Sequence, residues 1–113
     1  MVAYELMVIL NPELSEEETE STLQRLQDIV REGKGEVSNL DKWGKRRLAY
    51  EVKKFREGYY AVMNFKAAPA VAAEVERIIK ITDNIIRYLL IRDEKAEREE
   101  REKREPEKVQ EEE

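Results

Sequence analysis

The chain contains no cysteine and no histidine among its 113 residues. Without cysteine it can form neither disulfides nor thiolate metal sites, which fits a reducing compartment. Without histidine it lacks the commonest general base and the commonest metal ligand in proteins. Its serine and threonine hydroxyls therefore have no imidazole to activate them. We expect a protein that binds without performing chemistry, with no cofactor and no metal.

Long apolar runs and phosphate-binding glycine loops are also missing. The longest apolar runs, such as residues 6–10 and 88–91, are far shorter than the ~20 residues needed to cross a bilayer. The first residues carry no basic side chain and reach Glu5 at once, unlike a secretory signal peptide. The Gly33-Lys34-Gly35 segment lacks the spacing of either nucleotide-binding glycine motif.

Charge is distributed unevenly along the chain, whose formal net charge is −5. Residues 93–113 hold 6 basic and 11 acidic side chains, so this segment accounts for the whole excess. In the rest, residues 1–41 hold 3 basic and 10 acidic side chains, whereas residues 42–66 hold 8 basic and 2 acidic ones. Such polarity orients a protein on a charged partner better than net charge does. The basic segment is therefore the candidate functional region.

The first third of the chain predicts a strand followed by a helix. Residues 4–10 form an apolar run ended by Pro12, typical of a central strand buried on both faces or nearly so. Ser15 and Glu18 have the spacing of a capping box, after which apolar residues recur every three or four positions. A helix is therefore expected over residues 15–32.

The two ends of this helix carry residues suited to them. The acidic residues 16–18 and Glu20 are better explained by the positive end of the helix dipole than by a magnesium or acid–base site. At the other end, Gly33-Lys34-Gly35 is expected to supply a left-handed cap.

The middle of the chain predicts a β-hairpin. Residues 36–43 form a weaker strand that leads into Gly44, where a bulge or bend would re-aim the cations that follow. Residues 47–53 alternate apolar and polar side chains and predict a half-buried strand with one polar face. Arg56-Glu57-Gly58 is the expected turn, and residues 59–65 return as a strand.

A second helix and a last strand complete the pattern. Pro69 is a natural first-turn residue, the apolar positions 71, 75, 78 and 79 form a buried stripe, and Asp83-Asn84 ends the helix. Residues 85–91 form a final apolar strand interrupted only by Arg87.

The order strand, helix, strand, strand, helix, strand predicts an α+β fold of the ferredoxin-like (βαββαβ) type. Two right-handed crossovers around a hairpin give a four-stranded antiparallel sheet with two helices on one face. The first and third strands are then central and the second is an edge strand. The sheet face without helices stays open for binding.

Residues 93–113 differ from the rest. They mix Glu with Lys and Arg and contain essentially no core-forming residue apart from Val109. Such a segment cannot bury enough apolar area to order itself. We therefore divide the chain into a ferredoxin-like domain over residues 1–92 and a charged, acidic, disordered tail over residues 93–113.

Cations are concentrated on the predicted hairpin. Six of them fall within twelve residues: Lys45, Arg46, Arg47, Lys53, Lys54 and Arg56. A few charges are enough to guard an edge strand against aggregation, so a set of this density is interpreted as contacting phosphates. Lys42 lies just before this set and is included in the candidate site.

Aromatic residues are interleaved with these cations, an arrangement that can bind unstacked bases. Core or edge packing is nevertheless the preferred prediction for Trp43, Tyr50, Tyr59 and Phe65. Tyr4 and Tyr60 are the better stacking candidates if their side chains point outward.

The block Trp43-Gly44-Lys45-Arg46-Arg47-Leu48-Ala49-Tyr50-Glu51-Val52 closely resembles the bacterial small-subunit ribosomal protein S-six (S6) family. The likeness extends to Tyr4-Glu5, Asn11-Pro12, residues 55–59 and residues 81–87, and covers about residues 1–92. The family has the same ferredoxin-like fold that the strand order predicts.

This resemblance implies a structural, cytoplasmic protein of the small ribosomal subunit. It implies binding to the central domain of small-subunit ribosomal RNA together with ribosomal protein S-eighteen (S18). By the same likeness Tyr4, the Lys45-Arg46-Arg47 triplet, Arg87 and Arg92 are candidates for RNA or partner contact. The acidic tail could instead meet the basic partner protein.

Two functions of other classes remain as alternatives at this stage. One is a ferredoxin-like regulatory or small-ligand-binding domain that self-associates through its sheet. The other is a hydrolytic enzyme on the same fold, which the lack of histidine and cysteine disfavours. Salt separates the first from RNA binding, because RNA retention falls steeply with salt while apolar self-association hardly responds.

Overall fold

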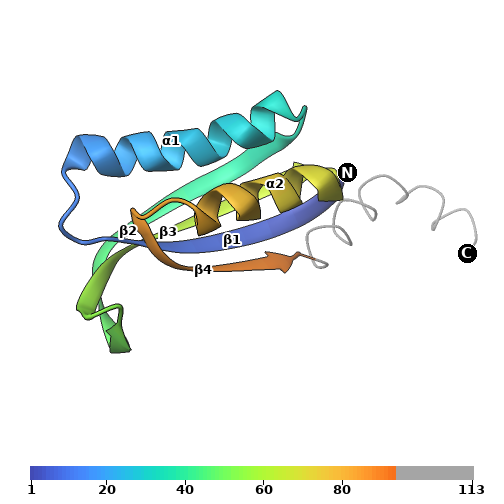
Figure 1. The fold of residues 1–113 in the computed structure, drawn as a ribbon. Helices are drawn as coiled ribbons and strands as arrows, with labels where there is room; N and C mark the ends of the chain where they lie inside the picture. The colour runs from blue at the N-terminus through green and yellow to red at the C-terminus, as the bar shows by residue number, and fades with distance from the viewer. Residues whose placement is uncertain (94–113) are drawn as a thin grey trace, which may run out of the picture.

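The computed structural model describes residues 1–93 as one four-stranded antiparallel sheet with two helices on one face (Figure 1). The elements are β1 (Val2–Leu10), α1 (Glu16–Glu32), β2 (Glu36–Val52), β3 (Phe55–Ala67), α2 (Pro69–Lys80) and β4 (Ile85–Arg92). The strand order is β2-β3-β1-β4, so β1 and β3 are central and β2 is an edge strand. The predicted fold is confirmed. The prediction for the tail lies outside the described residues, except at Asp93.

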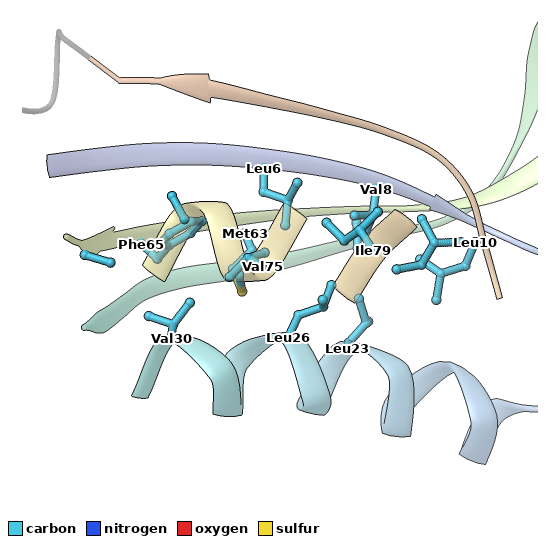
Figure 2. Close-up of a cluster of buried hydrophobic side chains, with 14 residues drawn as sticks. Leu6, Val8, Leu10, Leu23, Leu26, Val30, Met63, Phe65, Val75 and Ile79 are labelled. Carbon is cyan, nitrogen blue, oxygen red and sulfur yellow. The ribbon is translucent and has the colours of Figure 1, made fainter. Parts of the chain in front are cut away.

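The core lies between the two helices and the sheet face that they cover (Figure 2). Alternate residues of β1 point into it, and Leu6, Val8 and Leu10 are at most 2% exposed. Facing residues of α1, β3 and α2 close the cluster: Leu23, Leu26, Val30, Met63, Phe65, Val75 and Ile79. Each fully buried side chain of this size contributes about 1.5–3 kcal/mol. We call the uncovered side of the sheet the open face.

The predicted capping box is present at the start of α1. The Ser15 hydroxyl accepts a hydrogen bond from the Glu18 amide at 3.1 Å, and the Glu18 carboxylate accepts one from the Ser15 amide at 3.1 Å. The left-handed cap predicted for Gly33-Lys34-Gly35 is also present, and the residue that adopts it is Lys34, with φ +64°, whereas Gly33 has φ −83°. The Gly35 amide then bonds the Val30 carbonyl at 2.8 Å, so Lys34 closes the last turn.

The two predicted segments 36–43 and 47–53 form one continuous strand, β2, of 17 residues. Gly44 has φ +82°, and the pairing shifts there, because Lys42 lies opposite Ala61 and Gly44 lies opposite the adjacent Tyr60. Trp43 is therefore an extra residue of β2 that has no partner in the pairing with β3, and the predicted bulge is confirmed. One extra residue inverts which face the following side chains point to.

Replacing Gly44 with Ala should lower the free energy of unfolding by about 1–2 kcal/mol, because an L-residue is strained in the left-handed region. A Cβ at this position would have nothing within 4 Å, so no steric clash contributes to the loss. Urea unfolding measures the change. Gly44→Asn is the control and should lose less, since Asn tolerates positive φ. Equal stability of Gly44→Ala and the unsubstituted protein would contradict the assigned bulge geometry.

The prediction of a hairpin turn at Arg56-Glu57-Gly58 is wrong. The turn is formed by Lys53-Lys54. Val52 lies opposite Phe55, and the two lysines between them have φ +48° and +72°. A two-residue hairpin loop of type I′ needs positive φ at both positions, which usually selects Asn or Gly, so a Lys pair carries no recognisable signal. Gly58 belongs to β3, where its missing side chain has another role: a Cβ there would clash with Ile9 Cγ2.

The far end of the β2–β3 hairpin extends past the other strands and bends away from the helices (Figure 1). It returns toward β4 on the opposite edge of the sheet, where the Arg87 guanidinium donates a hydrogen bond to the Tyr50 hydroxyl. The Arg87 Cζ lies 5.3 Å from the centroid of the Tyr50 ring. This contact between the two edges of the sheet fixes the bent end over the open face. Neither helix of the described residues is long and apolar enough to cross a membrane.

Candidate nucleic-acid interface

The bulge divides neighbouring cations between the two sides of the hairpin. Lys45 lies opposite Tyr59, whose side chain packs against the core on the helix side. Arg47 follows two residues later on the strand and shares that side. Arg46 lies between them and points to the open face, where its Cζ is 5.9 Å from the centroid of the Trp43 ring. Three consecutive cations therefore do not form one surface.

Cations from both strands converge on a depression beside the loop between β1 and α1. We call it the helix-side depression. It has a volume of about 890 Å³ and is lined by Pro12, Glu13, Leu14, Lys45, Arg47, Lys54, Phe55, Arg56 and Glu57. Its four cationic side chains are exposed, and within residues 1–93 none of them makes an ion pair. Four unpaired cations around one concave surface concentrate positive potential there.

Lys42 differs from the other predicted site residues, because the protein's own carboxylate neutralises it. It lies on the helix side, opposite Ala61, and forms an ion pair with Glu20 of α1. The hydrogen bond to the Glu20 carboxylate raises the pKa of Lys42 above its ordinary value. Lys42 is thus turned toward α1 and is not one of the residues that line the helix-side depression.

A cluster of aromatic residues lies on the open face, and we call it the open-face aromatic cluster: Trp43, Tyr60 and Arg46. The Trp43 and Tyr60 rings stack with centroids 6.3 Å apart and an interplanar angle of 7°. The Trp43 Nε1–H donates to the Asp41 carboxylate at 3.0 Å. Tyr60 therefore points to the open face, as the stacking prediction required, and its ring already contacts Trp43.

Of the four aromatics for which core or edge packing was predicted, the two on the edge strand β2 are exposed. Trp43 is 45% exposed and Tyr50 is 61% exposed, whereas Phe65 is 1% exposed, as predicted for a core residue. Trp43 and Tyr50 both lie on the edge strand β2, and their rings contact Tyr60 and Arg87 on the open face, which neither helix covers. Tyr59, the fourth of these aromatics, is half-buried against the core.

The remaining candidates are not brought together with the helix-side depression. Tyr4 points to the helix side, and its ring stacks on Phe65 with centroids 5.3 Å apart, so it is not an outward-facing ring. Arg92 lies opposite Tyr4, at the other end of β1 from the hairpin. Arg87 is exposed but is engaged by Tyr50, and Lys53 is in the exposed hairpin turn.

One wall of the depression was not foreseen from the sequence. Pro12, Glu13 and Leu14 line it from the loop after β1. The pairing of Leu10 with Tyr59 brings this loop beside the hairpin. The strand order implies that neighbourhood, but the register that sets it was not readable from residue types.

Comparison with known proteins identifies the class. The model of the family "Ribosomal protein S6" matches residues 3–92. The small ribosomal subunit protein bS6 of Carboxydothermus hydrogenoformans is 51% identical over 92 residues, which cover 81% of this chain and 96% of the relative. The bS6 protein of Caldanaerobacter subterraneus is 48% identical over 92 residues, covering 81% and 97%.

A solved structure agrees with these sequence matches. The crystal structure of 30S ribosomal protein S6 from Thermotoga maritima superposes with a TM-score of 0.86 at 36% identity, covering 91% of this chain and 97% of that chain. Fold and matches together define a structural protein of the small ribosomal subunit, not an enzyme. The chain belongs to the ribosomal protein S6 family. This membership confirms the predicted resemblance and sets aside the hydrolase and regulatory-domain alternatives.

Proposed function

We propose that this protein binds the central domain of small-subunit ribosomal RNA, together with ribosomal protein S18, through the basic end of its β2–β3 hairpin. The observation that carries the proposal is the convergence of four exposed, unpaired cations from two strands on the helix-side depression. Arginine guanidinium groups match phosphate oxygens in a planar fork, and folded RNA is recognised largely by shape and backbone position. The protein binds and positions, and it makes or breaks no bond.

The charge balance supports a requirement for a second protein. Residues 1–92 carry equal numbers of basic and acidic side chains, 15 of each. The net charge of this domain is therefore zero and does not attract RNA, so only the cations of the hairpin do. Each phosphate that a protein neutralises adds about 0.7–0.9 to the slope of log affinity against log salt. A neutral domain with a few such contacts binds RNA weakly alone, and a more basic partner beside it supplies the missing attraction.

We assign different binding roles to the two parts of the chain. Residues 1–92 are assigned to the RNA- and partner-binding domain, and the acidic residues 93–113 to a separate segment that meets the basic partner protein. The composition of the segment supports this, because its 11 acidic side chains suit a cationic protein surface better than phosphates.

Cooperative assembly is the expected result of a binding titration. Central-domain RNA is titrated with this chain alone, with S18 alone and with both, and the pair should bind more tightly than either protein. The double variant Arg46→Ala/Arg47→Ala should weaken binding of the pair. Arg25→Ala/Arg31→Ala is the control, because it removes the same charge from α1. Equal RNA affinity for this chain alone and for the pair would overturn the proposal.

A further inference from the structure

We propose that the phosphate backbone of the RNA is held only in the helix-side depression, and that Arg46 makes no phosphate contact although Lys45 and Arg47 flank it. This inference rests on the proposed function and divides its site between two sides of one hairpin. It reverses the simplest interpretation of the sequence, in which three consecutive cations act together.

The directions of the side chains carry the first step. Lys45 lies opposite Tyr59 and Arg47 lies opposite Glu57, and both side chains point to the helix side. Arg46 lies opposite Gly58, and its side chain points to the open face. Side chains two residues apart on a strand are about 6.6 Å apart and parallel. Lys45 and Arg47 can therefore meet neighbouring phosphates of one RNA strand, while Arg46 cannot reach the same strand.

The composition of the depression carries the second step. Lys54 of the hairpin turn and Arg56 of β3 line the same surface as Lys45 and Arg47, giving four cations. Two carboxylates, Glu13 and Glu57, also line it. The surface is therefore positively charged overall but contains two negative charges. None of its four cations is within ion-pair distance of a carboxylate in residues 1–93, so all four can bind an arriving phosphate without breaking a salt bridge.

The open face has the opposite character around Arg46. The Arg46 guanidinium lies over the Trp43 ring at 5.9 Å, a distance at which the ring attracts a cation. A carboxylate lies close to this ring, because Asp41 accepts the Trp43 Nε1–H. A phosphate at Arg46 would draw the guanidinium away from the ring and approach Asp41. A phosphate in the depression also meets Glu13 and Glu57, but there four cations outnumber the two carboxylates.

Two adjacent arginines provide a matched test in the full-length chain with S18 and central-domain RNA. Affinity is measured at several KCl concentrations for Arg46→Ala and Arg47→Ala. Arg47→Ala should flatten the slope of log affinity against log salt by about 0.7–0.9 and weaken binding about five- to eightfold at 0.1 M salt. Arg46→Ala should leave the slope unchanged. Lys45→Ala is the second variant and should behave like Arg47→Ala.

A second readout comes from Trp43, the only tryptophan in the chain. When RNA is added to this chain alone at low salt, Trp43 emission should stay unchanged, because the depression and the open-face aromatic cluster lie on opposite sides of the hairpin. Quenching of Trp43 emission by RNA would place the RNA on the open face and overturn the inference. Both arginines are exposed, so urea unfolding should confirm that neither variant loses stability.

The outcomes separate this inference from the proposed function. If Arg46→Ala and Arg47→Ala flatten the slope equally, the division between faces is wrong and RNA binding stands. If RNA binds but neither variant nor Lys45→Ala changes the slope, the depression is not the phosphate site. If Arg47→Ala instead weakens binding of S18 in the absence of RNA, the depression is a protein-binding surface. If the pair binds no RNA at all, the proposed function itself fails.

Discussion

Neutralising the helix-side depression should lower the RNA affinity of the pair on the order of a thousandfold at 0.1 M salt. The variant replaces its four cations with glutamine: Lys45→Gln, Arg47→Gln, Lys54→Gln and Arg56→Gln. Each lost phosphate contact removes the counterion release that this contact provided. The losses multiply, because each contact changes the affinity by its own factor. Fluorescence anisotropy of labelled central-domain RNA, with S18 present, measures the loss.

Position and net charge are separated by a control with the same charge change. The control variant replaces four cations that do not line the depression: Arg25→Gln, Arg31→Gln, Lys34→Gln and Lys80→Gln. It should retain most of the RNA affinity, because charges away from bound phosphates act only through a screened long-range field. Equal losses in the two variants would mean that net charge, and not the depression, governs binding.

The largest expected loss of stability follows truncation of Phe65. This side chain is 1% exposed, points into the core and stacks on the Tyr4 ring at 5.3 Å. Phe65→Ala should lower the free energy of unfolding by about 3–5 kcal/mol, because it removes buried apolar surface and leaves a cavity that the core fills only partly. Urea unfolding monitored by circular dichroism measures the change.

A residue on the open face serves as its control. Leu89 is 53% exposed, so Leu89→Ala removes little buried surface and should change stability by no more than about 0.5 kcal/mol. If Leu89→Ala cost as much as Phe65→Ala, the assignment of covered and open faces would be incorrect. The comparison therefore tests the orientation of the sheet and not only its stability.

Local patterns were sufficient to predict the order and topology of the elements. The Ser15–Glu18 capping box and Pro69 are chemical signals that act within one helical turn, so they were readable without the tertiary structure. The apolar runs that became β1 and β3 identified the central strands, which have a neighbouring strand on both edges, whereas the charge-rich β2 is an edge strand. These features depend on residues near one another in the chain.

The hairpin turn was not predicted correctly because its residue types carry the wrong signal. Lys53 and Lys54 adopt positive φ although a glycine, Gly58, lies nearby. Gly58 is needed instead for the close approach of Ile9, a contact between distant parts of the chain. Conformations imposed by tertiary packing on ordinary residues leave no local trace, so the sequence alone could not place this turn.

The presence of a basic region was readable from composition, but the grouping of its cations was not. The density of cations after Trp43 predicted the region, and the structure brings four of those cations together around one depression. The side to which each cation points depends on one extra residue at the Gly44 bulge, which inverts the alternation for Lys45, Arg46 and Arg47. As the extra residue of this bulge on an edge strand, Trp43 stacks on Tyr60 and remains 45% exposed.

The most direct test of RNA binding by electrostatic contact in the helix-side depression is the salt dependence of affinity for the pair. The slope of log affinity against log KCl is compared between the unsubstituted protein and the four-glutamine variant of the depression. Loss of four phosphate contacts should flatten the slope by about 3 units. An unchanged slope would show that these four cations meet no phosphate, and would contradict the account at its centre.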